Sequence, residues 1–485
     1  MAKPESDSLF LLTDLYQLTM ACGYWKRGKA EQEAVFHLTF RRNPFGGEFT
    51  VACGLAPVLE FLQEFHLSES DRVYLEALTG ADGKPLFETA FLDDLAKRKL
   101  TCDIDAVPEG TVVFPQEPLV RVKGPLLEAQ LLETVLLNIV NFQSLIATKA
   151  ARICMAARGN RVLEFGLRRA QGINGGLSAS RAAYVGGCHA TSNVLAGKVY
   201  GIPVAGTHAH SWVMSFDSEQ ESFQAYAQAM PNNCIFLVDT YNTAAGIANA
   251  IRTGRWLRKQ GHEMLGVRLD SGDLASLSVD ARRLLDEAGF RETAIVASGD
   301  LDEHSIAELY DRGAPIAVLG VGTKLATGYD DPALGGVYKL SAIRDEEGNW
   351  QPKLKTSNDP AKASDPGLLQ TRRFTKGGNF LCDVIYDELE PPTTDWAMVD
   401  PSHPAGAEPV GANAESEDLL VPVLRAGEPV YQPPSIEESR QRTYDQLAYL
   451  PRETRQLTHP RTYRVGLDQG LHERKAKLIE DILNG

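Results

Sequence analysis

Several common signatures are missing from this chain of 485 residues. Its seven cysteines are scattered and no two have C-x-x-C spacing, so neither a zinc knuckle nor a redox pair is supported. No uncharged apolar run is as long as a membrane-spanning helix. The N-terminal segment has too short an apolar stretch for a signal peptide. We therefore expect a cytoplasmic protein with reduced thiols.

The chain also has fewer basic than acidic residues. The 49 Lys and Arg residues face 64 Asp and Glu residues, which gives a formal net charge of -15. An acidic surface repels phosphates and anionic lipids, so neither nucleic acid nor a membrane is an expected partner. An anionic substrate would need a local basic site. The hydrophobic content of 43% is that of an ordinary globular protein, and the length suggests two or three structural units.

The middle of the chain repeats a strand-then-helix pattern. Its short apolar segments lack alternation, which is typical of strands that are buried on both faces. They lie at 161–166, 203–207, 234–240, 264–270, 294–300 and 315–322. Such units imply right-handed crossovers and a parallel sheet. We predict an irregular parallel α/β barrel over residues 126–345, and the pattern alone leaves an open doubly wound sheet as the alternative.

The flanking regions have a different character. Residues 1–125 combine an early helix with extended runs broken by Pro and Gly, which predicts a small α+β domain that parts of 345–430 complete. Residues 346–485 are expected to form a return segment and a helical tail. There, Ser435 and Glu438 have the spacing of a capping box, which opens a helix. The predicted fold class is α/β, with this flanking domain and a C-terminal helical extension.

Each predicted strand ends in polar side chains, glycine or both. The ends read GLRRAQG, GTHAHS, DTYN, RLDSGD, SGDLDE and GVGTK. Ligands bind at the carboxyl ends of barrel strands, because helix N-termini and free loop amides converge there. A barrel that only packed would not need polar residues at every end. The sequence therefore predicts a ligand site at this edge.

Individual residues at these ends allow more than one interpretation. Small residues before a helix suit a phosphate, although Asp273 and Asp300 also fit helix caps. Asp239 and Asp270 suit ribose hydroxyls or hydrated Mg²⁺, and equally N-capping. Phe165 offers a stacking face, next to two arginines that also fit an exposed basic loop.

Two histidines, His208 and His210, alternate on an extended segment. Only one of them is therefore expected to point into the site. A histidine there suits a nucleophile, an acid or a base, and composition does not say which of the two it is.

In chain order, these segments resemble a known family. TDLYQLTMACGYW, EFGLRRAQG, ATSNVLAGKVYGIPVAGTHAHSWVMSF, VDTYNT, VRLDSGDL, SGDLDE and GVGTKL are similar to the nicotinate phosphoribosyltransferase family. The resemblance implies a type II phosphoribosyltransferase fold and a head-to-tail homodimer with shared active sites. It also implies that nicotinate and PRPP form nicotinate mononucleotide and pyrophosphate, with Mg²⁺ and coupled ATP hydrolysis, in NAD salvage.

The same resemblance implies roles for single residues. His210, rather than His208, is the histidine that ATP phosphorylates. Tyr16 from the neighbouring subunit and Phe165 sandwich the pyridine ring. Arg268, with Arg168, attracts the nicotinate carboxylate.

Further roles follow from the resemblance in the same way. Asp239 and Asp270 hold the ribose and the Mg²⁺-pyrophosphate, so Mg²⁺ is bound mainly through substrate. The other implied substrate contacts are Thr191, Ser192, Asn193, Thr207, Ser271, Gly299, Gly322 and Thr323.

The sequence departs from the family pattern in the segment AKASDPGLLQTRR. It keeps Lys362 but has leucines, Leu368 among them, where relatives carry a second lysine. Arg372 is a candidate replacement. Arg41 and Lys355 are further candidates for pyrophosphate, and all of these basic residues also fit ordinary surface charges. His208 stands where relatives often have an aliphatic residue, which leaves its role open.

Two other functions compete. In nicotinamide phosphoribosyltransferases an acidic residue in the segment matching Thr191–Asn193 accepts a hydrogen bond from the amide, and that segment has no acid here. A non-catalytic phosphate- or nucleotide-binding scaffold would predict the loss of polar strand ends, and none is obviously lost.

Overall fold

The computed structural model describes residues 8–356, 363–392, 396–400, 406–411 and 413–484. The chain divides into two compact units. Met1–Ser144 and Ala333–Gly485 make one, here called the composite unit, and Leu145–Pro332 make the other, the central unit. The sequence placed the domain boundaries at 126 and 345. These positions differ from the unit boundaries in the structure because helix α6 (Glu133–Ala156) begins in one unit and ends in the other, and because β12 (Gly336–Arg344) joins a composite-unit sheet.

The central unit holds a six-stranded sheet with the order β7-β6-β11-β10-β9-β8. Every strand pair in it is parallel. The strands are β6 (Arg161–Glu164), β7 (Ala190–Thr191), β8 (Ile235–Leu237), β9 (Gly266–Leu269), β10 (Ala294–Ser298) and β11 (Val318–Val321). This is the strand order of a barrel ring that is open between β7 and β8. The predicted fold class is confirmed, with the barrel realised as a half-barrel.

One predicted strand, 203–207, is wrong. The structure has a two-residue strand, β7, earlier in the chain, and Val204 joins it through a single bridge to Thr191. Backbone bonds run from the Thr191 N–H to the Pro203 carbonyl (3.0 Å) and from the Ala205 N–H to the Thr191 carbonyl (3.0 Å). Pro203 has no N–H to donate, which limits this segment to a short pairing.

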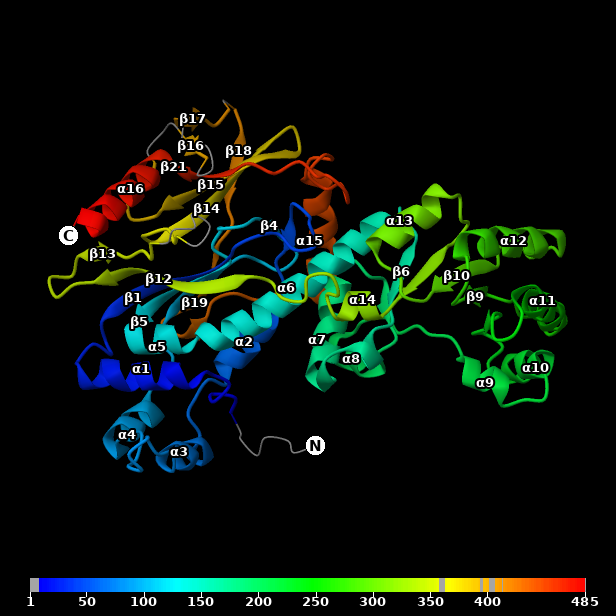
Figure 1. Ribbon diagram of the computed structural model, residues 1–485, viewed down its shortest axis with the longest axis horizontal. Helices are drawn as coiled ribbons and strands as arrows, with labels where there is room; N and C mark the ends of the chain where they lie inside the picture. Colours follow the sequence, from blue (N-terminus) through cyan, green and yellow to red (C-terminus); the bar gives the residue numbers. More distant parts are fainter. Residues whose placement is uncertain (1–7, 357–362, 393–395, 401–405, 412, 485) are drawn as a thin grey trace. The chain divides into compact units, whose positions relative to one another are not determined.

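Several helices of the central unit begin at a residue whose side chain caps the first turn. The side chain of Asn242 accepts from the Ala245 N–H and that of Asp302 from the Ser305 N–H. Helices α10 to α12 follow one another beside the sheet (Figure 1). The bounds are η1 (Leu167–Arg169), α7 (Gly172–Val185), α8 (Val194–Tyr200), α9 (His210–Met214), α10 (Glu219–Ala229), α11 (Thr243–Lys259), α12 (Leu274–Glu287), α13 (Glu303–Asp311) and α14 (Thr323–Ala326).

The composite unit is built from both ends of the chain. One sheet has the order β13-β12-β1-β5-β3-β19-β20, a second β17-β16-β21-β15-β14-β18, and β2 pairs with β4. The bounds are β1 (Glu33–Phe40), β2 (Thr50–Val51), β3 (Asp103–Ala106), β4 (Val112–Val113), β5 (Val120–Pro125), β13 (Trp350–Pro352), β14 (Leu369–Lys376), β15 (Asn379–Asp387), β16 (Ala397–Val399), β17 (Glu408–Pro409), β18 (Glu415–Asp418), β19 (Val421–Arg425), β20 (Glu428–Pro429) and β21 (Val465–Asp468). Since β12, β13, β19 and β20 flank β1, β5 and β3, the first sheet needs both ends of the chain.

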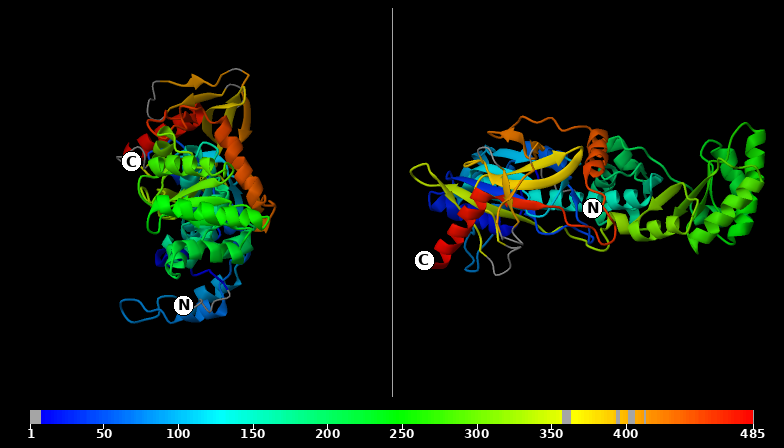
Figure 2. Two further views of the ribbon diagram at one scale, coloured as in Figure 1. Left: turned by 90° about the vertical axis from the view of Figure 1, so that its right-hand side faces the viewer. Right: turned by 90° about the horizontal axis from the view of Figure 1, so that it is seen from above.

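The composite unit also contains helices. They are α1 (Leu15–Lys26), α2 (Leu55–Gln63), α3 (Glu69–Glu76), α4 (Thr89–Lys97), α5 (Leu126–Leu131), α15 (Ile436–Tyr449) and α16 (Gln469–Asn484). Leu132 separates α5 from α6. The capping box of Ser435 and Glu438 opens α15 as predicted. Helix α16 packs against β16 and β21 (Figure 2).

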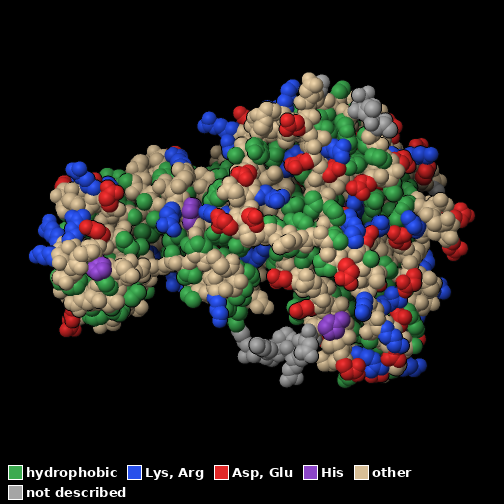
Figure 3. All heavy atoms as spheres, turned by 180° about the vertical axis from the view of Figure 1, so that it is seen from behind, with side chains coloured by type: hydrophobic (Ala, Val, Ile, Leu, Met, Phe, Trp, Pro, Cys, Tyr) green, Lys and Arg blue, Asp and Glu red, His purple; other side chains and the backbone are tan. Residues whose placement is uncertain are grey.

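The surface agrees with the acidic composition. On the face seen in Figure 3, acidic and basic side chains are interspersed, and the coloured residues gather into no broad basic field. Within the described parts of the chain, no helix combines the length and the apolar character that a bilayer crossing requires.

Candidate active site

Arg268, in β9, is the centre of a polar cluster at the strand ends of the central unit. Its Nη2 donates to Asp270 Oδ1 (2.6 Å), its Nη1 to Thr207 Oγ1 (2.9 Å) and its Nε to Ser298 Oγ (2.7 Å). The Arg268 side chain is 13% exposed. A guanidinium has five N–H groups, so two of them remain beyond these three bonds. They are available to an anionic ligand.

Asp270 is held as an anion. Burial alone would raise its pKa, but hydrogen bonds from Ser298 and Arg268 outweigh burial and lower the pKa below its usual value. The Ser298 hydroxyl and the Arg268 guanidinium both bond to Oδ1, so Oδ2 faces the rest of the cluster. A fixed negative charge next to a strand end suits a developing positive charge or a metal-bound ligand.

Asp239, just after β8, has an unsatisfied oxygen. Its Oδ2 accepts from the Asp270 backbone N–H (2.8 Å) and from Ser271 Oγ (2.7 Å). Its Oδ1 is buried and accepts no hydrogen bond from the described residues. A buried carboxylate oxygen in this state fits a cation or a hydroxyl donor, and carboxylates are preferred Mg²⁺ ligands. Nowhere in the described chain do three His, Cys, Asp or Glu side chains converge as a full ligand set, so these residues fit Mg²⁺ only together with a ligand.

His210 opens α9 at the edge of this cluster. Its Nδ1 lies 3.1 Å from Thr240 Oγ1, and its Nε2 lies 3.7 Å from Asp270 Oδ2. The His210 side chain is 40% exposed. An imidazole held through one nitrogen presents the other to a reactant, so Nε2 is the accessible nucleophile or base.

His208 has the opposite environment. It is 7% exposed, and its ring lies within 6.3 Å of the rings of Phe223, Tyr226 and Phe236. Burial lowers the pKa of His208 to about 4, so the ring is neutral at neutral pH. The structure therefore places one histidine at the start of α9, partly exposed beside the cluster, and the other in the core.

Two glycines allow close packing beside the cluster. Gly299, in the turn after β10, has φ of 101°, and a Cβ there would lie 2.3 Å from the Asp270 carbonyl oxygen. A Cβ on Gly320, within β11, would lie 2.7 Å from the Phe165 ring. Larger side chains are therefore excluded at both positions. Gly322 and Thr323 begin α14 in the same region of the chain.

Helix capping near these turns differs from the sequence interpretation. Asp302, not Asp300, is the N-cap of α13, because Asp300 has a positive φ of 40° inside the turn. Lys324 also donates to Asp302 at 2.5 Å. Asp273 does precede α12, but it makes no side-chain bond to the backbone of the first turn and instead binds Arg312 at 2.7 Å.

A second, buried network lies around Glu164 at the end of β6. Thr191 Oγ1 (2.6 Å) and Ser180 Oγ (2.9 Å) donate to Glu164 Oε2, and the Gly166 N–H donates to Oε1. Asn193 Nδ2 in turn donates to Ser180 Oγ (3.1 Å). Thr191 and Asn193 are 1% and 2% exposed. Their polar groups take part in this buried network, and their expected contacts with the substrate stay predictions.

Phe165 follows Glu164 directly in the sequence. The Arg268 guanidinium carbon lies 5.8 Å from the centre of the Phe165 ring. Ser192 is half-buried, and its N–H donates to the Glu164 carbonyl at 2.9 Å. Arg168, in η1, is exposed.

Residues 160–389 match the nicotinate phosphoribosyltransferase (NAPRTase) family, 11–141 its N-terminal domain and 370–475 its C-terminal domain. The chain is 42% identical over 491 residues to nicotinate phosphoribosyltransferase of Bacillus subtilis, which covers 99% of this chain and 98% of that protein. The Homo sapiens enzyme of that name is 37% identical and covers 95% of each. The chain belongs to the nicotinate phosphoribosyltransferase family.

Solved structures agree with this membership. The crystal structure of human nicotinic acid phosphoribosyltransferase superimposes with a TM-score of 0.84 at 34% identity and covers 96% of this chain and 99% of that one. A nicotinate-nucleotide pyrophosphorylase from Pyrococcus furiosus, at 22% identity and a TM-score of 0.70, shares the fold.

The remaining predicted residues of this nicotinate phosphoribosyltransferase family member lie in the composite unit. Tyr16 is exposed on α1, and burial of its hydroxyl end together with Glu133 raises its pKa to about 12. Arg41 follows β1, and Lys355 is exposed after β13. Arg372, in β14, makes a two-bond pair with Asp418 at 2.8 and 2.7 Å. Lys362 lies outside the described residues.

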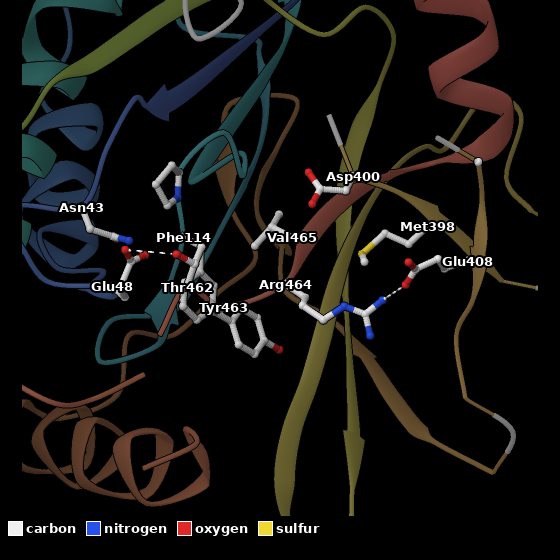
Figure 4. Close-up of a pocket in the computed structure, with 12 residues that line it drawn as sticks. Asn43, Glu48, Phe114, Met398, Asp400, Glu408, Thr462, Tyr463, Arg464 and Val465 are labelled. Atoms are coloured by element: carbon white, nitrogen blue, oxygen red, sulfur yellow. Dashed lines mark hydrogen bonds and ion pairs between the residues drawn. The ribbon is translucent and has the colours of Figure 1, made fainter. Parts of the chain in front are cut away.

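A cavity of about 370 Å³ in the composite unit holds none of the predicted site residues. Figure 4 shows Arg464 directed at Glu408 on one side of it, at 2.5 Å, and Thr462 bonded to Glu48 on the other, at 3.3 Å. Its polar lining is therefore already paired in part.

Sequence reasoning missed three polar residues around the site. Ser298 bridges Arg268 and Asp270, and Thr240 contacts His210. Glu164 carries the buried network. Each is a polar residue within or just after an apolar strand, and that signal was present in ASGD, VDT and LEF.

Proposed function

We propose that this protein joins nicotinate to PRPP, forming nicotinate mononucleotide and pyrophosphate in the salvage route of NAD biosynthesis. The observation that carries the proposal is the strand-end cluster of Arg268, Asp270, Asp239 and His210 in a chain of this family. The cluster combines an anion-binding guanidinium, fixed carboxylates and an exposed imidazole, which is the chemistry that this reaction needs.

In the transfer, the bond from ribose C1 to pyrophosphate breaks and a bond from C1 to the pyridine nitrogen forms. The ribose carries positive charge in the transition state, and the anionic Asp270 would stabilise it. The free Oδ1 of Asp239 would hold a ribose hydroxyl or Mg²⁺. When bound with PRPP, Mg²⁺ neutralises charge on the leaving pyrophosphate. Positioning and charge neutralisation would then supply most of the rate enhancement.

Nicotinate would bind next to Arg268. Two guanidinium N–H groups remain for its carboxylate, and Phe165 lies beside the guanidinium to stack on the pyridine ring. The positive-φ turn at Gly299 and the amides of Gly322 and Thr323 suit the 5'-phosphate of PRPP. Arg168, Ser192 and Thr207 would complete the substrate contacts.

ATP hydrolysis would act through His210. Nε2 would attack the γ-phosphorus of ATP, so that an N–P bond forms as the P–O bond to ADP breaks. Water then cleaves the phosphohistidine and releases phosphate. The contact between Nδ1 and Thr240 would keep Nε2 directed outward throughout.

A homodimer would complete the site. Helix α1 exposes Leu15, Tyr16 and Met20, and helix α8 exposes Val194 and Val199. Exposed apolar residues grouped on a helix are typical of contact surfaces. In the dimer, Tyr16 of one subunit would stack on the pyridine bound near Phe165 of the other.

Pyrophosphate would be bound by basic residues of the composite unit. Arg41 and Lys355 take part in no ion pair within the described residues, and Lys362, outside them, stays a further candidate. Arg372 is committed to Asp418, so its use would require that pair to open. This makes Arg372 the weaker replacement for the lysine missing near Leu368.

The test is an assay of the purified protein with PRPP, Mg²⁺ and either nicotinate or nicotinamide, with and without ATP. We expect nicotinate mononucleotide, formed faster with ATP. His210→Ala should lose the ATP stimulation, and the matched control His262→Ala, at an exposed histidine after α11, should keep it.

Other outcomes would contradict the proposal. Product from nicotinamide alone would assign the site to the amide. If neither base gives product while calorimetry detects PRPP binding, the protein is a phosphate-binding scaffold.

A further inference from the structure

The half-barrel has an open edge at β8, and one backbone donor there is buried. In the parallel pairing of β8 with β9, the Val238 N–H donates to the Arg268 carbonyl at 3.1 Å. Successive N–H groups of a strand point to opposite sides, so the Leu237 N–H points away from β9. Leu237 is 1% exposed, and no strand lies on that side of β8 in the described structure. A buried donor in this position needs an acceptor from elsewhere.

His208 supplies that acceptor. Its Nε2 lies 3.3 Å from the Leu237 nitrogen, where the carbonyl of a further strand would otherwise be. To accept this bond Nε2 must be unprotonated, so the proton of the neutral ring is on Nδ1. The Nδ1 atom lies 3.5 Å from the Ala209 carbonyl oxygen, which suits that tautomer. The aromatic rings around His208 exclude water from the bond.

The same segment reaches the opposite edge of the sheet. Pro203 and Ala205 bond to the backbone of Thr191 in β7, and His208 bonds to β8. Residues 203–208 therefore cross the opening between the two edge strands, through backbone bonds on one side and one side-chain bond on the other.

Two residues of the proposed machinery are neighbours of His208 in this segment. Thr207 accepts from Arg268 at 2.9 Å, and His210 faces Asp270 at 3.7 Å. The His208 ring points into the core between them. A shift of this ring would therefore move both contacts together.

We propose that His208 is a positioning residue: its Nε2 bond to the Leu237 N–H closes the half-barrel and thereby fixes Thr207 and His210 against Arg268 and Asp270. His208 itself touches no substrate. The kinetic part of this inference rests on the proposed function, whereas the bond itself does not.

The tautomer tests the bond in the wild-type protein. Long-range ¹H–¹⁵N correlation of ¹⁵N-histidine-labelled protein, with His208→Gln to assign the signal, should show His208 neutral and protonated at Nδ1 at neutral pH. A proton on Nε2 would overturn the proposal. This readout needs no activity.

Two variants test the consequence. His208→Gln keeps an acceptor near the position of Nε2, and His208→Phe keeps a ring without one. In His208→Phe we expect faster hydrogen exchange of the peptide that contains Leu237, kcat lower by about tenfold or more, and KM for nicotinate within about threefold of wild type. His208→Gln should restore most of the slow exchange and most of kcat. The control His262→Phe should change neither the exchange rate nor kcat.

The outcomes separate the two proposals. Wild-type exchange and kcat in His208→Phe would overturn the positioning role. If the wild-type protein transfers no phosphoribosyl group, the proposed function fails, and the tautomer and the exchange rates still decide whether the bond to Leu237 exists.

Discussion

Each unit contains an arginine–aspartate pair, and the two pairs differ in burial. In the composite unit, Arg373 bonds to both oxygens of Asp383, at 3.0 and 2.5 Å, and both side chains are 0% exposed. In the central unit, Arg268 bonds to one oxygen of Asp270 at 2.6 Å, and the pair is 13% and 27% exposed. In the composite unit the arginine bonds to both carboxylate oxygens and the pair is fully buried, whereas in the central unit it bonds to one oxygen and the pair stays partly exposed.

The position of each pair along its strand explains the difference. Arg373 and Asp383 are cross-strand partners within the β14–β15 hairpin, where Tyr463 also donates to Asp383 at 3.0 Å. Arg268 and Asp270 stand at the end of β9, where the backbone turns away. A mid-strand pair can only stabilise the fold, whereas a strand-end pair keeps donors for a ligand. Four changes can break or sharpen this comparison.

The largest expected effect is on stability, from Asp383→Asn. The change leaves the Arg373 charge buried without its counter-charge, which should lower the free energy of unfolding by about 3–5 kcal/mol. Urea denaturation measures it. The control is Glu117→Gln, which replaces a neighbouring buried carboxyl whose pKa is raised well above its usual value by burial and by the charge of Asp383, and which leaves Arg373 and Asp383 in place. Equal losses in both variants would contradict the role of the pair.

Asp270→Asn should instead reduce turnover. We expect kcat to fall by about 10²–10³-fold, because a fixed negative charge at the reacting ribose is lost. The free energy of unfolding should change by less than about 1 kcal/mol, since Asp270 is partly solvated. The control Asp273→Asn, three residues along and exposed, should keep nearly full turnover. Similar losses from both aspartates would show that the strand end, rather than Asp270, matters.

Gly299→Ala should moderately lower both the stability and the turnover. The new Cβ would meet the Asp270 carbonyl oxygen at 2.3 Å in a backbone with positive φ, which should cost about 1–3 kcal/mol and at least about tenfold in kcat. Gly313→Ala is the control, because its φ is also positive, 77°, but no atom lies within 4 Å. Steady-state kinetics and thermal unfolding of both variants distinguish a local clash from backbone strain alone.

The smallest effect concerns pH. Burial opposes ionisation of Asp302, but bonds from Lys324 and Ser305 outweigh it and lower its pKa to about 2. Because the folded pKa is below the unfolded value, near about 3.9, this stability is present above about pH 4 and is lost as the pH falls towards 2.

Asp302→Asn keeps an N-cap oxygen but removes the ion pair. It should lower stability by about 1 kcal/mol at neutral pH, and the difference from wild type should disappear near pH 2. Unfolding curves between pH 5 and 2 measure this, and parallel curves for the two proteins would contradict it.

Local patterns in the sequence predicted a large part of the fold. Short buried strands, the capping box at Ser435 and the polar strand ends are all encoded within a few residues. The strand at 203–207 was mispredicted because an apolar run does not say which neighbour it pairs with, and β7 is only two residues long. The bond between Thr191 and Glu164 was not predicted, because the two residues lie 27 positions apart in the chain.

By itself, the sequence determined the α/β class, the capping box at Ser435, the family and the set of polar residues at the strand ends. Hydrophobic period and capping depend on residues within a turn or two of one another, so they can be read locally. Only the tertiary structure decided that His208 is buried while His210 is partly exposed, and that one arginine–aspartate pair is fully buried while the other stays partly exposed. Burial and pairing depend on contacts between residues far apart in the chain, such as Leu369 and His37, and no local pattern specifies them.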